Sequence, residues 1–201
     1  MKTILFDFGN VIAFFDHQRA IARLARYTDM PPFELTLALY GGTIENDYEM
    51  GRLPTAEYFR LAKLNGRLTC SEAEFVDAFV DIFWRNDEVC DLIPKLKPRY
   101  RLVLASNTND AHFRKYCDQF ADVIRHFDHL CPSHVIGERK PHPEYFAGCQ
   151  RFVDARPEEC LFVDDLAVNI EAATKHGWAG VCYRADGTLA EKLRAAGVLI
   201  G

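Results

Sequence analysis

The sequence lacks the features that mark several other classes of protein. No apolar run approaches the roughly 20 residues that a membrane-spanning helix needs. Basic residues are not in excess, because 24 Lys and Arg against 29 Asp and Glu leave a net charge of −5. This charge argues against non-specific binding to nucleic acid or to membranes. There is no internal repeat, no low-complexity segment and no room for a signal peptide before the first apolar run. We therefore expect a cytoplasmic globular protein.

Paired cysteines are also missing. The chain has seven cysteines, an odd number, and none forms a Cys-x-x-Cys pair. Most of them lie among apolar residues, which favours reduced, buried thiols over disulfides or a zinc site. Histidines other than His112 show no spacing typical of metal ligands, and we interpret them, His17 included, as structural. Tyr48, Glu49 and Arg52 either line a surface that faces the substrate or lie on the solvent-facing surface of a helix, and we favour the second interpretation.

The first apolar segment carries a single carboxylate near its end. Residues 2–8 predict a buried strand, and Asp7 lies in it just before the break at Gly9-Asn10. A buried parallel strand presents such a group at its C-terminal edge, where open α/β sheets bind ligands. A buried carboxylate is costly unless it is paired or bound to a metal. Asp7 therefore predicts a cation nearby.

The remainder of the 201 residues divides into two regions. Residues 15–85 carry helix signals and no strand signal, which predicts an inserted helical bundle. From residue 86 onward, short apolar strands alternate with helices, which favours a parallel sheet with right-handed crossovers. The predicted helices are 16–25, 32–40, 44–50, 55–64 and 71–83 in the first region, and 89–96, 110–120, 143–152, 166–176 and 188–196 in the second. The predicted strands of the second region are 101–105, 129–131, 160–164 and 180–183.

Polar residues follow three of the predicted strands. Asp7 ends the first, Ser106 and Asn107 end the strand at 101–105, and Asp164 and Asp165 end the strand at 160–164. Parallel strands share a direction, so these groups meet at one edge of the sheet. The carboxylates would repel each other there. A divalent cation relieves that repulsion, and oxygen-only ligands suit Mg²⁺.

A lysine completes the predicted site. Lys140 lies in a loop just before a predicted helix and can reach the same edge. Acids, a metal, a hydroxyl and a lysine together suit a phosphoryl group. The metal and Lys140 neutralise its oxygens, Ser106 donates a hydrogen bond to one of them, and a carboxylate attacks phosphorus.

Four short motifs in this order resemble those of the haloacid dehalogenase (HAD) superfamily. They are Asp7-Phe-Gly-Asn-Val11, Ser106-Asn107, Lys140-Pro141, and Phe162-Val-Asp164-Asp165 with Asn169. The resemblance covers the whole chain and implies a Rossmann-like three-layer α/β/α core (residues 1–14 and 86–201) with a type 1 helical cap (residues 15–85) inserted after strand 1. The segments Leu104–Asn109 with His112, and Ser133–Gly137 before Arg139-Lys-Pro, resemble the bacterial subgroup that contains the α-D-glucose-1-phosphate phosphatase.

The resemblance also implies roles for individual residues. Asp7 is the nucleophile and forms an aspartyl-phosphate. Asp7, the backbone carbonyl of Gly9 and Asp164 hold Mg²⁺, with Asp165 bound directly or through water. Ser106, Asn107 and Lys140 bind the phosphoryl group, and Asn169 orients Asp165 or Lys140.

One position departs from the pattern of the superfamily. Most of its phosphatases carry a second Asp two residues after the nucleophile, which acts as general acid and base, and here that residue is Gly9. Such a group contributes about 10²–10⁴-fold to the rate. The resembling subgroup also has Gly there and is enzymatic. His112 and Asp16 are candidate replacements, although either can simply cap a helix. We expect a preference for good leaving groups, such as anomeric sugar phosphates or aryl phosphates.

The sequence thus predicts a Mg²⁺-dependent phosphatase of a small phosphorylated metabolite, in particular a sugar phosphate, acting as a monomer or homodimer. A haloacid dehalogenase and a phosphomutase are alternatives within the superfamily. The pair Asp164-Asp165 argues against the metal-free dehalogenase, and Gly9 argues against the mutase. A phosphate-binding regulatory module that has lost turnover because of Gly9 is the alternative outside enzymes.

Overall fold

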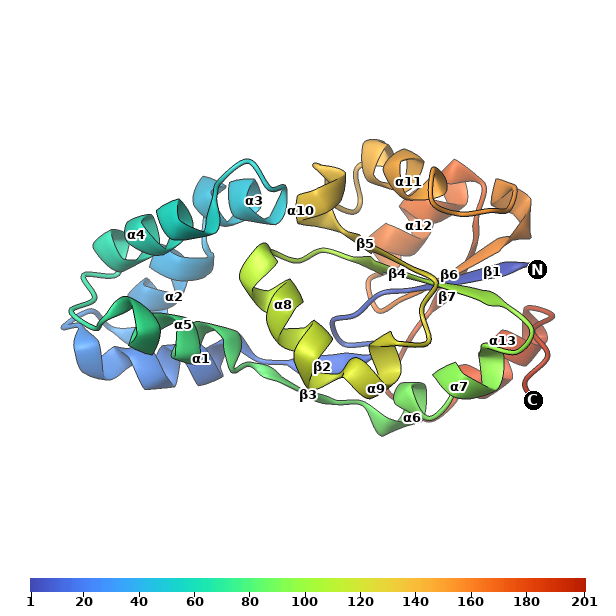
Figure 1. The fold of residues 1–201 in the computed structure, drawn as a ribbon, viewed down its shortest axis with the longest axis horizontal. Coiled ribbons are helices and arrows are strands. Elements are labelled where there is room, and N and C mark those ends of the chain that lie inside the picture. Colours follow the sequence, from blue (N-terminus) through green and yellow to red (C-terminus); the bar gives the residue numbers. More distant parts are fainter.

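The N-terminal apolar segment forms the central strand of a parallel sheet. In the computed structural model, which describes residues 1–201, all four residues of β1 (Thr3–Phe6) are buried. Five strands are arranged in the order β5-β4-β1-β6-β7, and every neighbouring pair is parallel (Figure 1). Asp7 therefore leaves the sheet at its middle. The other strands are β4 (Arg101–Ser106), β5 (His129–Pro132), β6 (Cys160–Asp164) and β7 (Ala179–Cys182).

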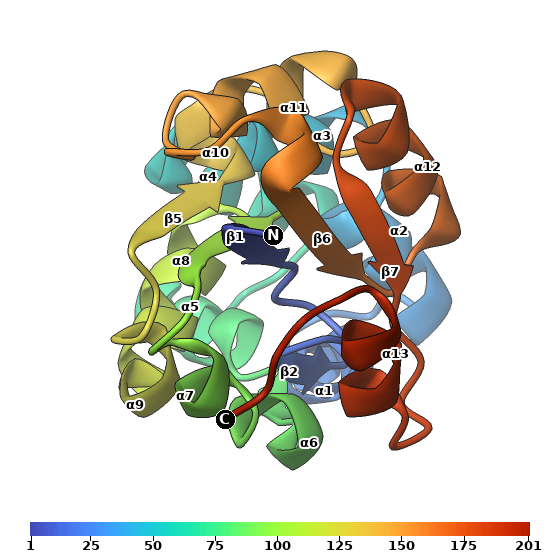
Figure 2. The ribbon, with the colours of Figure 1, turned by 90° about the vertical axis from the view of Figure 1, so that its right-hand side faces the viewer.

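Helices cover both faces of this sheet. Side chains alternate between the two faces along each strand, so Ile4 and Phe6 belong to one hydrophobic cluster and Leu5 to another. Figure 2 shows the sheet between the two layers of helices, which is the three-layer α/β/α core that the sequence predicts. One layer contains α6 (Asp87–Cys90), α7 (Ile93–Leu96), α8 (Asp110–Gln119), α9 (Ala121–Ile124) and α13 (Leu189–Ala195). The other contains α10 (Ser133–Ile136), α11 (Pro143–Gln150) and α12 (Ala167–His176).

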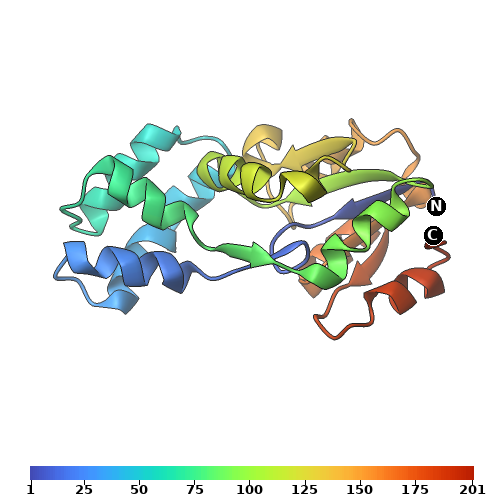
Figure 3. The same cartoon turned by 60° about the horizontal axis from the view of Figure 1, so that its bottom comes forward.

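A separate helical bundle, α1–α5, lies at one end of the elongated molecule (Figures 1 and 3). It has its own cluster of 14 buried apolar residues, which includes Tyr58, Phe75 and Phe79. A capping box at Ser71 and Glu74 begins α5, as its sequence indicates. The division into domains at residues 14/15 and 85/86 stays a prediction. The bundle consists of α1 (His17–Leu24), α2 (Pro32–Tyr40), α3 (Thr43–Glu49), α4 (Thr55–Asn65) and α5 (Glu72–Val80).

The expectation that residues 15–85 contain no strand is wrong at both ends of this range. β2 (Ala13–Phe15) pairs antiparallel with β3 (Phe83–Arg85), and Phe15 lies opposite Phe83. The aromatic side chains favour a strand, but three-residue segments give no periodic signal, and each strand is completed only by a partner about seventy residues away. Both chain crossings between bundle and core are therefore joined in one ribbon (Figure 3).

Short helices account for the other differences. The predicted helix 89–96 is two four-residue helices, α6 and α7, and Pro94 lies in the first turn of α7. The sequence gives no signal for α9 and α10, which are too short to display helical periodicity. No helix in the structure combines the length and the apolar character that crossing a bilayer requires.

Candidate active site

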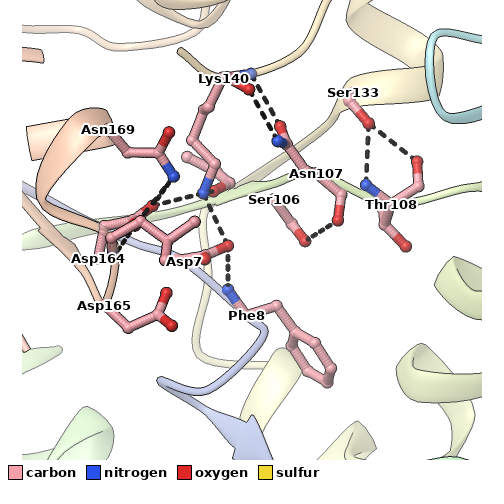
Figure 4. A network of polar contacts seen from close by, with 12 residues as sticks. Asp7, Phe8, Ser106, Asn107, Thr108, Ser133, Lys140, Asp164, Asp165 and Asn169 are labelled. Carbon is pink, nitrogen blue, oxygen red and sulfur yellow. Dashed lines mark hydrogen bonds and ion pairs between the residues drawn. The ribbon is translucent and has the colours of Figure 1, made fainter. Parts of the chain in front are cut away.

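Three carboxylates converge at the C-terminal edge of the sheet. Asp7 follows β1, Asp164 ends β6 and Asp165 follows it (Figure 4). One carboxylate oxygen from each of the three lies within 4.8 Å of the others. This arrangement of oxygen donors fits Mg²⁺, which binds to proteins through one or two carboxylates and keeps several waters. The sequence correctly predicted that these three residues meet.

Lys140 lies between two of these carboxylates. Its Nζ is 2.8 Å from Asp7 Oδ1 and 2.7 Å from Asp164 Oδ2, and it donates a hydrogen bond of 2.9 Å to the carbonyl of Ala105. The side chain is only 1% exposed. Burial lowers the pKa of Lys140, but Asp7 and Asp164 together raise it above its ordinary value. Lys140 is therefore a cation fixed at the bottom of the site.

One lysine does not compensate all of the negative charge. Burial raises the pKa of Asp7 to about 7; Lys140 opposes this rise, while Asp164 and Asp165 add to it. Burial and the charge of Asp164 likewise raise the pKa of Asp165. A second cation at this place would stabilise the ionised carboxylates.

Two asparagines hold the carboxylates in place. Asn169 Nδ2 donates to both oxygens of Asp164, at 3.0 and 3.1 Å. The sequence predicts that Asn169 orients Asp165 or Lys140. In the structure Asn169 contacts Asp164 instead, because the first turn of α12 places it beside the end of β6. The residue that contacts Asp165 is Asn10, whose Nδ2 lies 3.3 Å from Asp165 Oδ2. The sequence alone does not indicate this role of Asn10.

The loop after β4 fixes the backbone of Lys140. Asn107 Nδ2 donates to the carbonyl of Lys140 at 2.9 Å, and Asn107 Oδ1 accepts from the amide of Lys140 at 2.8 Å. The side-chain amide of Asn107 is thus used to position Lys140, and its contact with phosphate stays a prediction. Ser106 Oγ makes a long contact of 3.4 Å with the carbonyl of Asn107, and Ser106 lines a pocket that also includes Phe8 and Gly9.

This pocket opens between the core and the helical bundle. It has a cavity volume of about 70 Å³. Gly9, Ser106 and Asn107 line it on the side of the core, whereas His17 and Glu49 come from the bundle. The pocket therefore borders Phe8 and Gly9, which follow Asp7 in the chain, and two parts of the chain enclose it.

Comparison with known proteins agrees with this fold. The family model of haloacid dehalogenase-like hydrolases matches residues 1–177. The chain belongs to this family. A D-ribitol-5-phosphate phosphatase from Bacteroides thetaiotaomicron is 30% identical over 187 residues, which are 89% of each chain.

Solved structures share the fold of this HAD-like hydrolase. A HAD family enzyme from B. thetaiotaomicron, in complex with magnesium and inorganic phosphate, superposes with a TM-score of 0.80 at 23% identity. The match covers 92% of this chain and 96% of that one. A predicted HAD-like hydrolase from Porphyromonas gingivalis gives 0.83, also at 23% identity, and covers 98% of both chains.

The place of the usual second aspartate of the family is filled by an aromatic ring. A Cβ atom on Gly9 would lie 2.9 Å from Cε1 of Phe15. Phe15 belongs to β2, so the ribbon that joins bundle and core also covers the position at which a general acid would stand. The side chain missing at Gly9 thus leaves no open space, and the role of its carbonyl as a metal ligand stays a prediction.

The structure argues against both candidate replacements for the missing acid. His112 Nε2 lies 3.0 Å from the carbonyl of Phe79, and Nδ1 lies 3.0 Å from Asn109 Nδ2, so both ring nitrogens have partners in the protein. Burial lowers the pKa of His112 to about 3, which keeps the ring neutral. Asp16 Oδ1 accepts from the amide of Gln18 at 2.8 Å and caps α1 on the exposed surface. The sequence alone gives no sign of the direction in which either side chain points.

Proposed function

We propose that this HAD-like hydrolase is a Mg²⁺-dependent phosphatase that hydrolyses a small phosphorylated metabolite through an aspartyl-phosphate on Asp7. The observation that carries the proposal is the buried contact of Lys140 Nζ with Asp7 and Asp164, next to a third carboxylate. An acid at a strand end, a fixed lysine and three metal-binding oxygens are the components that phosphoryl transfer needs. The similarity to a D-ribitol-5-phosphate phosphatase supports the same reaction class.

The environment of Asp7 defines how it would attack. Oδ1 accepts a hydrogen bond of 2.7 Å from the amide of Phe8 and contacts Lys140. The second carboxylate oxygen remains for the attack on phosphorus, which breaks the bond from phosphorus to the alcohol. Lys140 and Ser106 would bind the phosphoryl oxygens, and water would then hydrolyse the aspartyl-phosphate. Mg²⁺, when bound, neutralises the carboxylates and the phosphoryl charge.

Two observations support a sugar or polyol phosphate as substrate. The relative from B. thetaiotaomicron acts on a polyol phosphate, as its name states. The motifs around Asn107 and Lys140 also resemble the α-D-glucose-1-phosphate phosphatase subgroup, which places an anomeric phosphate among the compounds to test. Because Gly9 offers no general acid, we expect aryl and anomeric phosphates to react faster than simple alkyl phosphates. Equal rates for aryl and alkyl phosphates would contradict this preference. We place the enzyme in the cytoplasm, as a monomer or homodimer.

An assay with p-nitrophenyl phosphate tests the proposal. We expect turnover with Mg²⁺, none after chelation, and none in Asp7→Asn, whereas Asp118→Asn on the exposed side of α8 should behave as wild type. Release of chloride from a 2-haloacid would indicate a dehalogenase instead. Binding of phosphate or of a metabolite without any turnover would indicate a regulatory module.

A further inference from the structure

The wall of the pocket that faces the phosphate-binding loop carries a buried carboxylate with unused hydrogen-bonding capacity. Glu49 is the last residue of α3, and its side chain is only 16% exposed. Its Oε2 is closed to solvent and faces Arg139, whereas Oε1 has no partner within the protein. Since Glu49 lines the same pocket as Ser106, a substrate bound there is the available partner for this oxygen.

The charge of Glu49 is compensated from behind. Arg139 Nη2 lies 3.1 Å from Glu49 Oε2, outside hydrogen-bond geometry, and the guanidinium also contacts Asn46 Oδ1. Burial raises the pKa of Glu49, while Arg139 and Lys140 lower it. Burial, with the charge of Glu49, also raises the pKa of Glu45 to about 8, so Glu45 adds little negative charge at neutral pH. A carboxylate can therefore share this pocket with a phosphate anion.

A histidine adds a second polar group to this wall. The ring of His17 stacks on Tyr40, with 3.9 Å between centroids and an angle of 7° between the planes. Stacking, rather than hydrogen bonding, fixes its orientation, so its ring nitrogens remain for a ligand. The neighbouring surface consists of the apolar side chains of Phe15, Ile82 and Phe83. Apolar side chains next to one carboxylate and one imidazole suit a ligand whose carbon chain carries hydroxyl groups.

We propose that Glu49, assisted by His17, forms a subsite for the hydroxyl groups of the substrate's alcohol portion, and so selects polyol and sugar phosphates over plain alkyl phosphates. This inference rests on the proposed phosphatase activity. A hydroxyl of the substrate donates to Glu49 Oε1, whereas an alkyl chain leaves that oxygen without a partner. Sites built to bind a hydroxyl reject analogues that lack it, because their polar groups then stay unpaired.

Two substrates of equal chain length isolate this effect. D-Ribitol 5-phosphate and n-pentyl phosphate are both primary alkyl phosphates, so the bond that breaks is closely similar and only the hydroxyls differ. We expect wild-type kcat/KM to be at least about tenfold higher for the polyol. Glu49→Ala should lower kcat/KM for ribitol 5-phosphate by about 10- to 100-fold, mainly through KM, and change that for pentyl phosphate less than about twofold.

Further variants separate binding from packing. Glu49→Gln keeps the shape of the side chain but loses its charge. It should lower kcat/KM for the polyol by less than Glu49→Ala does and leave kcat/KM for pentyl phosphate unchanged. If the alanine variant does not fold, Glu49→Gln provides the test. His17→Phe keeps the stack on Tyr40 and removes both ring nitrogens. It should likewise lower kcat/KM only for the polyol. Glu57→Ala is the matched control, because Glu57 is bonded to Arg60 on the outer face of α4, away from the pocket.

The possible failures are distinguishable. If p-nitrophenyl phosphate is hydrolysed but the wild type does not prefer the polyol, the subsite is wrong and the phosphatase stands. The same conclusion follows if Glu49→Ala lowers kcat/KM equally for both substrates, because an equal loss would indicate a role in the chemical step. If none of the three phosphates is hydrolysed, the proposed function fails, and the subsite fails with it.

Discussion

The ring of Phe15 lies directly over Gly9, with its Cε1 2.9 Å from the point at which a Cβ on Gly9 would stand. The two residues complement each other: the backbone approaches the ring closely because residue 9 has no side chain. An aspartate introduced at position 9 would therefore need the ring to move. The position of the usual general acid of the family is closed by packing as well as by sequence.

This relationship predicts that Gly9→Asp alone is not a simple gain of function. We expect it to lower the free energy of unfolding by about 1–3 kcal/mol, because the added side chain overpacks against Phe15. Gly9→Asp combined with Phe15→Ala should accept the carboxylate and hydrolyse n-pentyl phosphate at least about tenfold faster than Phe15→Ala alone, since a general acid can contribute far more than that. Denaturant unfolding and steady-state kinetics measure the two effects. A folded double variant no faster than Phe15→Ala would contradict this explanation.

Lys140 is predicted to be required for stability as well as activity. Lys140→Met leaves Asp7 and Asp164 buried without their shared cation, and breaking such a pair costs about 3–5 kcal/mol. We expect that loss in the free energy of unfolding at neutral pH without Mg²⁺, together with loss of phosphatase turnover. Lys95→Met, at an exposed position on α7, serves as the control. A variant as stable as wild type would show that the carboxylates do not depend on Lys140.

Mg²⁺ is predicted to stabilise the folded protein, independently of any assay of activity. A ligand that binds only the native state adds about 2.7 kcal/mol at 100 times its dissociation constant. We expect the unfolding midpoint of the wild type to rise with Mg²⁺ concentration, and Asp165→Asn to need more Mg²⁺ for the same rise. Asp118→Asn should respond as wild type. An unfolding midpoint that does not change with Mg²⁺ concentration would contradict the metal site.

The buried, neutral His112 predicts a loss of stability in acid. Burial lowers the pKa of His112 to about 3 in the folded protein, from an ordinary value of 6.5. Between these values the unfolded chain binds a proton that the folded protein does not, so this contribution to stability falls as the pH falls from about 6.5 to about 3. His112→Gln removes this titrating group. Below about pH 6 the free energy of unfolding of the wild type should therefore fall relative to that of the variant. His126→Gln, remote from the pocket, should leave the profile unchanged.

Much of the site follows from short stretches of sequence. Strand side chains alternate with a period of two, and parallel strands end at one edge, so Asp7, Asp164 and Asp165 are brought together by local pattern alone. Lys140 was assigned by its place in the motif order, and its Nζ does contact two of these acids. Short elements with distant partners escaped this reasoning: β2 and β3 form only because the chain returns after the bundle.

What the sequence by itself determined is the parallel sheet, the family and the cluster of acids, because strand direction and turn chemistry are fixed within a few residues. Only the tertiary structure decided which way helix and loop side chains face. It bonded His112 to the carbonyl of Phe79, used Asn107 to hold Lys140, and brought His17, Glu49 and His112 to one pocket. A helix exposes many directions at once, and which of them meets the site depends on how the whole helix docks.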